Sequence, residues 1–378
     1  MESIGLYIHI PFCRQKCLYC DFPSWAGKDE QMQAYVDALA EEIRVRGRRY
    51  AEKRVISVFF GGGTPTALPI PMLRQLMQAV MESFSLTADA EITTEANPGT
   101  LSIEMAAALR QMGFNRLSMG VQAWQNEKLK QLGRIHTIED FLENYRAVRQ
   151  AGFDNVNVDL MFALPRQTMA QWQETVSRIT ALQPEHISAY SLILEEGTPF
   201  YERYEKGELE PLSEETDREM YHWAVDYWAE HGYRQYEISN FAREGRRSRH
   251  NRIYWQAEEY LGLGLGAHSY MEGERFHNSY DLQKYIAAKG NPTLLKEDAE
   301  TITEADALAE FMFLGLRLTE GVSFARFRQR FGKDMEAVYG KEMRELTEQG
   351  LLLQDAAGVR LSRRGIDVSN FVFEKFLL

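Results

Sequence analysis

The sequence is poor in cysteine, with three among its 378 residues. It contains no apolar run of about 20 residues, the length that an α-helix needs to cross a bilayer. Its first residues lack the basic stretch and the small-residue cleavage site of an export signal. These absences argue against a disulfide-stabilised secreted protein and against a membrane-spanning one. We therefore expect a cytoplasmic protein.

An excess of positive charge is also missing. The chain has 43 lysines and arginines against 55 aspartates and glutamates, which gives a formal net charge of −12. A protein that binds nucleic acid replaces the counterions of the phosphates with lysine and arginine side chains. One basic stretch exists at residues 243–252, and such charge runs are usually solvated loops. We expect no nucleic-acid partner.

The cysteines that are present lie together, as Cys13, Cys17 and Cys20, directly after the apolar segment 6–10. Thiolates ligate iron–sulfur clusters, so this loop can hold three irons of a [4Fe-4S] cubane and leave the fourth iron open to a small molecule. A structural zinc site needs a fourth ligand, which would have to be His9. A disulfide would leave one cysteine unpaired. We interpret the loop as the ligand set of an open cluster.

Short apolar runs alternate with amphipathic helical stretches over residues 6–240. This alternation predicts a parallel sheet with helices outside it. Polar residues and glycines follow several strands, as expected of a barrel whose site lies at the carboxyl ends of the strands. A doubly wound open sheet would fit the alternation as well. The candidate strands are 6–10, 55–60, 91–95, 116–119, 155–160, 186–192 and 235–239.

The pattern changes after about residue 285. Helical stretches at 303–316, 323–331 and 341–350 are followed by a short hairpin around Ala356-Ala357-Gly358. This order indicates a small winged-helix-like module, which lacks the basic face of a DNA reader and which we interpret as a lid or packing domain. The expected domains are a core at 1–240, a segment at 241–290 that carries the string HNRIYW and a glycine-rich loop, and a C-terminal domain at 291–378.

Six strings along the chain carry a family resemblance: YIHIPFC at 7–13, GGG at 61–63, EANPG at 95–99, RLSMGVQ at 116–122, LGR at 132–134 and DLM at 159–161. They resemble the radical SAM superfamily, and within it the coproporphyrinogen III dehydrogenase-like (HemN/HemW) branch. The resemblance implies a partial parallel (β/α) barrel, in which S-adenosylmethionine (SAM) binds the open iron through its amino and carboxylate groups.

The resemblance also implies which residues line the SAM pocket. Their types suit that cofactor, because carboxylates accept from hydroxyl and amino groups and arginine pairs with a carboxylate. Each also has a plain structural alternative: Asp159 could cap a helix, and Arg134 could form a surface ion pair. The implied residues are Tyr7, Tyr19, Gly62, Gly63, Thr64, Glu95, Gln122, Arg134 and Asp159.

Two departures separate this chain from the dehydrogenases of the branch. Those enzymes carry a further cysteine two positions after the third, where this chain has Phe22. They also have an N-terminal extension that reaches the substrate, whereas the first strand here begins about where the chain does. Both differences argue against porphyrinogen decarboxylation.

A third string, HNRIYW at 250–255, resembles a signature of the heme chaperones in the same branch. A neutral imidazole can ligate heme iron, and aromatic rings offer a flat apolar surface to the macrocycle. The flanking arginines could pair with the propionates. The candidate heme residues are His250, Asn251, Tyr254 and Trp255. A second-choice ligand, His268, lies in the glycine-rich segment 261–269, which we interpret as a close-packed loop.

These resemblances lead to one functional hypothesis, a heme chaperone that binds a [4Fe-4S] cluster, SAM and heme. It would deliver heme to acceptor hemoproteins such as membrane-bound respiratory enzymes, take electrons from a donor, and lack coproporphyrinogen dehydrogenase activity. An exposed cluster edge would favour a homodimer. The alternatives are an oxygen-independent coproporphyrinogen III dehydrogenase and a relative of radical SAM heme-degrading methyltransferases.

Overall fold

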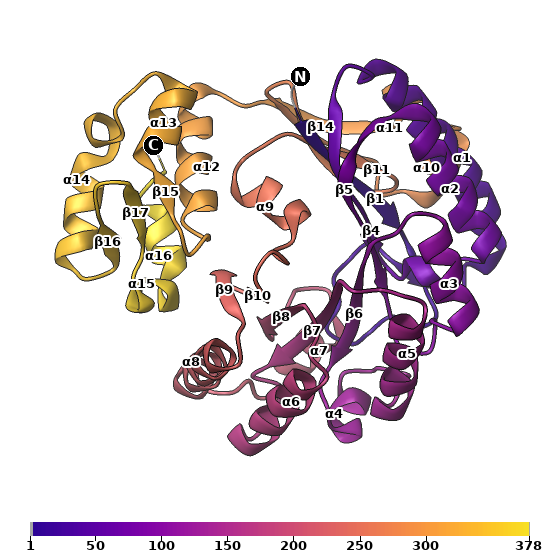
Figure 1. Ribbon diagram of the computed structural model, residues 1–378, viewed down its shortest axis with the longest axis horizontal. Coiled ribbons are helices and arrows are strands. Elements are labelled where there is room, and N and C mark those ends of the chain that lie inside the picture. Colours follow the sequence, from indigo (N-terminus) through magenta and orange to yellow (C-terminus); the bar gives the residue numbers. More distant parts are fainter. Residues whose placement is uncertain (1–2, 378) are drawn as a thin grey trace.

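The computed structural model describes residues 3–377, which form a large mixed sheet, an outer layer of helices and a separate C-terminal module (Figure 1). Six strands pair in parallel, each with the next along the chain. Such an arrangement brings their carboxyl ends to one edge. The six strands are β1 (Ser3–Ile10), β4 (Arg54–Gly62), β5 (Ser85–Ala96), β6 (Arg116–Gln122), β7 (Val156–Phe162) and β8 (His186–Ser191).

Helices cover the outer side of these strands (Figure 1). In α2, the buried residues Leu73, Leu76, Met77 and Val80 recur at intervals of three and four, so that they form one inward stripe. Each such side chain contributes about 1.5–3 kcal/mol when it leaves water. The main outer helices are α1 (Met32–Arg49), α2 (Ile70–Ser83), α3 (Ile103–Gln111), α5 (Ile138–Gln150), α6 (Met169–Ala181) and α8 (Glu214–Glu230).

Shorter elements connect the main ones. No helix within residues 3–377 has both the length and the apolar character needed to cross a membrane. The connecting elements are β2 (Phe12–Cys13), β3 (Trp25–Ala26), α4 (Asn126–Gln131), α7 (Pro199–Glu205), β9 (Arg234–Glu237), β10 (Asn240–Ala242), α9 (Arg249–Trp255), α10 (Leu282–Ala287) and α11 (Pro292–Leu295), with 3-10 turns at Asp29–Gln31 and Pro65–Ala67.

The strand order confirms the predicted α/β partial barrel. The sheet of the described residues has twelve strands in the order β14-β13-β12-β11-β1-β4-β5-β6-β7-β8-β10-β9, so β14 and β9 are its two free edges. The barrel is therefore open. Every strand expected from the sequence is present, and all but β5, which begins at Ser85 rather than at residue 91, lie within a few residues of the predicted bounds.

The sheet continues beyond β1 in a way that the sequence did not reveal. Residues expected to form a loop include β11 (Tyr260–Leu263), which pairs in parallel with β1, and β12 (His268–Met271). The antiparallel strands β13 (Glu274–Asn278) and β14 (Lys296–Thr301) complete this side. Glycine has a low strand propensity, so the residue pattern typical of a strand cannot be recognised in this segment. A Cβ at Gly262 would lie 2.1 Å from the carbonyl oxygen of His268, so close packing requires this glycine.

A buried carboxylate fastens the end of β11 to α1. Glu42 accepts hydrogen bonds from the amide of Gly264 at 3.0 Å, the hydroxyl of Tyr285 at 2.6 Å and the amide of Asn278 at 2.7 Å. Burial raises the pKa of Glu42, whereas Arg46 and these donors lower it. A buried charged group needs such partners, since an unpaired one is costly.

The C-terminal module has its own core and the predicted order of helices and hairpin. A three-stranded sheet in the order β15-β17-β16 packs against the helices. The module lies beside α9 and the end of the barrel (Figure 1). Its elements are α12 (Glu304–Gly315), β15 (Val322–Ser323), α13 (Phe324–Phe331), α14 (Met335–Glu348), β16 (Leu352–Gln354), β17 (Gly358–Leu361), α15 (Arg363–Asp367) and α16 (Ser369–Glu374).

The packing at Gly264 can be tested by substitution. Its φ is +100°, and a Cβ would lie 2.7 Å from both the carbonyl oxygen of His9 and the hydroxyl of Tyr35. We expect Gly264→Ala to lower the free energy of unfolding by about 2–4 kcal/mol, measured by urea denaturation. Gly273→Ala is the matched control, because its φ is +75° and its Cβ would meet open space. It should cost only about 1 kcal/mol, and equal losses would contradict the packing argument.

Candidate functional site

A cavity of about 350 Å³ lies at the carboxyl ends of the parallel strands, within the size range of small-molecule sites. The cysteine loop after β1, the glycines at the end of β4 and the ends of β5 to β8 form its walls. These segments lie together because the strands run in parallel, which places their carboxyl ends at one edge of the sheet. The predicted residues that line it are Cys13, Cys17, Tyr19, Cys20, Gly62, Gly63, Glu95, Gln122, Arg134 and Asp159.

The three cysteines are half-buried and face this cavity together. The hydroxyl of Thr64 donates to the sulfur of Cys13 at 3.6 Å, and the guanidinium of Arg134 donates to that of Cys17 at 3.4 Å. Burial raises the pKa of the Cys13 thiol and raises that of Cys20 to about 11. Metal coordination deprotonates such thiols outright. The donor set therefore fits a thiolate-ligated metal group.

The geometry of the loop bears on which metal group would fit. Among residues 3–377, no three histidine, cysteine, aspartate or glutamate side chains converge on one point as the ligands of a single ion do. In a cubane, each thiolate binds a different iron, so the sulfurs stand apart. Three thiolates on one loop suit that arrangement.

The glycines after β4 allow the backbone to close against β1. Gly62 has a φ of +108°, and a Cβ there would lie 2.4 Å from the ring of His9. A Cβ on Gly63 would lie 2.7 Å from the carbonyl oxygen of Phe12. The amide of Gly62 donates to a carboxylate oxygen of Glu95 at 3.1 Å. These glycines thus hold the cavity wall in place.

Two acidic side chains, Glu95 and Asp159, face the cavity from β5 and β7, the strands on either side of β6. Burial, and next the negative charge of Asp159, raise the pKa of Glu95 to about 8. Burial also raises the pKa of Asp159, although hydrogen bonds from Ser118 at 2.8 Å and Asn157 at 2.7 Å oppose the shift. Like charges in one buried site disfavour joint ionisation. A cationic ligand would relieve that repulsion.

Gln122 reaches the cavity from a strained position. Its φ is +70°, and β6 has a register shift between Gly120 and Gln122. A Cβ on Gly120 would lie 2.9 Å from the side-chain nitrogen of Gln122. Bulges redirect side chains, and strained residues of this kind cluster at functional sites. The irregularity therefore turns an amide toward the ligand space.

Arg134 is held by its own chain. One guanidinium nitrogen donates to the side-chain oxygen of Asn97 at 2.6 Å and to the carbonyl oxygen of Gly120. Asn97 in turn donates to Thr64 at 2.7 Å. Arg134 thus sits between the cysteine loop and the end of β5. Its predicted pairing with the SAM carboxylate stays a prediction.

Sequence reasoning missed several residues that also line the cavity. Some lie inside the strings that carried the family resemblance. Others lie near the end of β8 or after it, where no motif marked them. The additional lining residues include Asn97, Ser118, Met161, Tyr190 and Ile193.

The predicted heme residues of the 250–255 string do not share one surface. His250 is buried, with its Nδ1 2.9 Å from the hydroxyl of Ser57 and its Nε2 2.8 Å from that of Tyr254. Its ring stacks on Phe59 at 5.1 Å. Burial lowers the pKa of His250 to about 3, so the ring is neutral. Both ring nitrogens are engaged, and an axial role for His250 stays a prediction.

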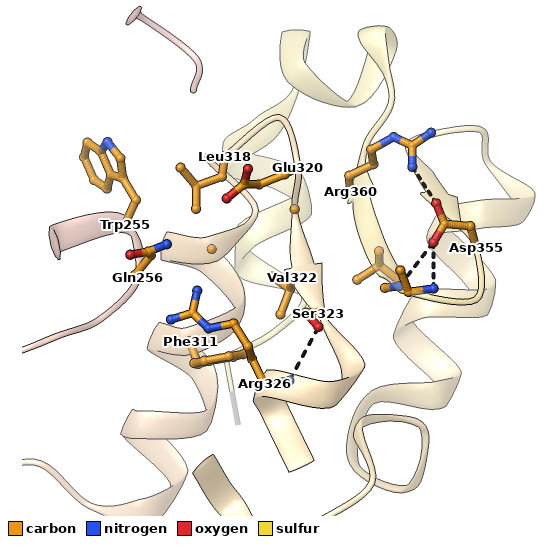
Figure 2. Close-up of a pocket in the computed structure, with 15 residues that line it drawn as sticks. Trp255, Gln256, Phe311, Leu318, Glu320, Val322, Ser323, Arg326, Asp355 and Arg360 are labelled. Carbon is orange, nitrogen blue, oxygen red and sulfur yellow. Dashed lines mark hydrogen bonds and ion pairs between the residues drawn. The ribbon is translucent and has the colours of Figure 1, made fainter. Parts of the chain in front are cut away.

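The other members of the string diverge from His250. Tyr254 lines a second cavity together with Tyr7, whereas Asn251 is half-exposed on α9. Trp255 faces a cavity of about 230 Å³ at the joint with the C-terminal module, near Leu318 (Figure 2). The apolar surface predicted for a macrocycle is therefore divided between two places.

The basic stretch at residues 243–252 runs into α9 and is largely paired within the chain. Four of its five arginines bind carboxylates of the barrel and of the C-terminal module, and the fifth, Arg243, lies over the ring of Tyr233 at 5.0 Å. These four are not a free cationic surface. The pairs are Arg246–Asp154 at 3.2 Å, Arg247–Glu320 at 3.0 Å, Arg249–Asp89 at 2.9 Å and Arg252–Glu320 at 3.4 Å.

Comparisons with known proteins give two matching family models and a solved structure with the same fold. The model of the radical SAM superfamily matches residues 7–179, and that of the HemN C-terminal domain matches residues 302–368. The solved coproporphyrinogen III oxidase (HemN) from Escherichia coli aligns with a TM-score of 0.86 at 23% identity, over 100% of this chain and 90% of that one. This likeness shows the fold.

Curated relatives extend over nearly the whole chain. The heme chaperone HemW of Lactococcus lactis is 38% identical, over 98% of this chain and 97% of its own. HemW of Bacillus subtilis is 38% identical, over 98% of both. HemW of Escherichia coli is 32% identical, over 100% of this chain and 99% of its own. The cysteine loop, the cavity and these full-length similarities together show that the chain belongs to the HemW family of the radical SAM superfamily.

Proposed function

We propose that this protein is a cytoplasmic heme chaperone that binds a [4Fe-4S] cluster, SAM and heme. The observation that carries the proposal is the full-length similarity to proteins named heme chaperones, combined with three cysteines at the mouth of a cofactor-sized cavity. Its partners would be heme, acceptor hemoproteins such as membrane-bound respiratory enzymes, an electron donor and a second copy of the chain.

The cysteine loop would hold the cluster. Cys13, Cys17 and Cys20, which line the cavity, would each supply one thiolate and leave the fourth iron open to a small molecule. When bound, the reduced cluster and SAM supply the one-electron chemistry of the superfamily. Arg134 offsets negative charge at Cys17, since its guanidinium lies 3.4 Å from that sulfur.

The acidic side chains would recognise SAM. This cofactor carries positive charge and hydroxyl donors, which suit Glu95 and Asp159. The amide of Gln122 adds an uncharged partner, and the aromatic ring of Tyr19 forms part of the same wall. A positive ligand favours the ionised form of both acids, against the burial that raises their pKa values.

Phe22 favours a chaperone over a dehydrogenase. Its side chain is 56% exposed at the edge of the cofactor cavity, at the position where the dehydrogenases of the branch carry a fourth cysteine. A phenyl ring can neither ligate metal nor transfer a proton. It can contact an apolar ligand, which heme provides.

Loss of one cysteine should remove the cluster. We expect Cys17→Ala, reconstituted anaerobically with iron and sulfide, to lose the visible absorbance of the cluster and most of its bound iron. Asp21→Asn is the matched control, because this exposed residue lies on the same loop. Full absorbance in the Cys17→Ala protein would show that the ligands were assigned wrongly.

The raised pKa of Glu95 predicts a pH effect on stability. The folded protein keeps a proton on Glu95 up to about pH 8, whereas an unfolded chain releases it near 4.5. The free energy of unfolding should therefore fall as the pH rises between these values, by about 1.4 kcal/mol for each unit. Glu95→Gln cannot ionise, so relative to the parent it should be more stable at about pH 9 than at about pH 5.

Urea unfolding of the cluster-free protein measures this difference. Glu82→Gln changes an exposed glutamate on α2 and serves as the control. If the parent and Glu95→Gln lose stability in parallel as the pH rises, Glu95 does not hold its proton in the folded state.

The dehydrogenase alternative has a direct assay. We expect the reconstituted protein, supplied with SAM and a reductant under anaerobic conditions, to leave coproporphyrinogen III unchanged, because Phe22 replaces the fourth cysteine. Mass spectrometry would follow substrate and product, with a known dehydrogenase as the positive control. Steady turnover would refute the chaperone proposal.

A further inference from the structure

A second cavity, of about 360 Å³, opens on the side of β1 that faces β11. Aromatic rings make up most of its wall, and one side chain, Phe22, borders both this cavity and the cofactor cavity. The volume suits part of a large flat ligand. The side chains that matter here are Tyr7, Phe22, Tyr254, Tyr260, His268 and Tyr280.

Two imidazoles line this cavity, those of His9 and His268, and of these only His268 has a ring nitrogen without a hydrogen-bond partner among residues 3–377. Its Nε2 lies 2.8 Å from the hydroxyl of Tyr280, and its Nδ1 has no partner among residues 3–377. When Nε2 donates to the tyrosine oxygen, the lone pair of Nδ1 is available to a metal. By contrast, His9 uses both ring nitrogens, on Tyr7 at 3.0 Å and on Pro23 at 2.9 Å.

The surroundings keep the ring of His268 neutral. Burial, followed by the charges of His277 and Arg275, lowers its pKa. His277 packs against it at 5.0 Å, but both of its own nitrogens are engaged, by Asn278 at 2.9 Å and Asp298 at 3.0 Å. A neutral imidazole is the form that binds iron.

The glycine-rich segment fixes this arrangement. Gly266 has a φ of +62°, and a Cβ there would lie 2.6 Å from the ring of Tyr280. Only glycine lets Tyr280 approach the turn and hold His268 at the opening. The conformation that glycine permits is therefore used to place a ligand-binding side chain.

His250 contributes to the same cavity through another residue. Its Nε2 bonds to the hydroxyl of Tyr254, which meets Tyr260 edge to face at 4.6 Å. The buried histidine thus fixes the orientation of one aromatic wall. It acts as a positioning residue, since neither of its nitrogens faces the opening.

We propose that this cavity is the heme site, with His268 as the axial ligand of the iron and His250 as the residue that positions Tyr254. The assignment rests on the proposed function. The tyrosine rings supply flat contact for the macrocycle. A heme is larger than the cavity, so its propionate edge would stay outside, as suits a carrier that must release its cargo.

Hemin titration of the full-length protein tests the assignment. We expect His268→Ala to lose the spectroscopic signature of an axial histidine, read by electron paramagnetic resonance, and to bind hemin roughly tenfold more weakly or worse. His250→Ala and Tyr254→Phe should keep that signature and bind only a few-fold more weakly. His231→Ala, on the exposed end of α8, is the control and should match the parent.

The outcomes separate the two proposals. A parent protein that binds no hemin refutes the proposed function itself. Retained axial-histidine signal in His268→Ala, with its loss in His250→Ala, overturns the assignment of His268 and makes His250 the ligand. Should His268→Ala misfold by circular dichroism, His268→Met replaces it: a shifted ligand signature supports ligation by residue 268, and an unchanged one refutes it.

Discussion

The pairing of β1 on both of its edges governs the rest of the structure. This strand bonds in parallel to β4 on one side and to β11 on the other. Leu6, Ile8 and Ile10 are all fully buried, whereas the alternate residues Tyr7 and His9 point to the opposite face. The cysteine loop continues from the carboxyl end of β1, and its residue Phe22 lines both cavities.

Glycine makes this close arrangement possible on both sides. Residues 61–63 bring the turn after β4 against His9, and residues 262–266 bring the turn after β11 against the backbone of the same histidine. The two segments differ in sequence but meet the same need, which is room for a neighbouring backbone. Buried carboxylates complete each side: Glu95 accepts from Gly62, and Glu42 accepts from Gly264. The same glycine and carboxylate contacts therefore stabilise the fold and shape the site.

Much of the barrel could be predicted from the sequence, because its strands are apolar and its helices have a clear period. Strand β11 could not, since its glycines carry no side-chain pattern, and its partner β1 lies more than 250 residues away. The residues of the string at 250–255 do not all face one place, for a geometric reason. On a helix, His250 and Tyr254 stand four residues apart and touch each other. Trp255 follows Tyr254 and points about 100° away from it. A shared motif therefore does not imply a shared surface.

Phe22 gives this arrangement a thermodynamic consequence. Its ring belongs to the walls of both cavities, so any occupant that restrains or displaces it on one side alters the space on the other. Linkage of this kind is reciprocal: a nucleoside cofactor that changes the affinity for a macrocycle must have its own affinity changed by the same factor. If the two cavities hold the proposed ligands, loading of one and release of the other would be coupled through Phe22, without any need for a moving domain.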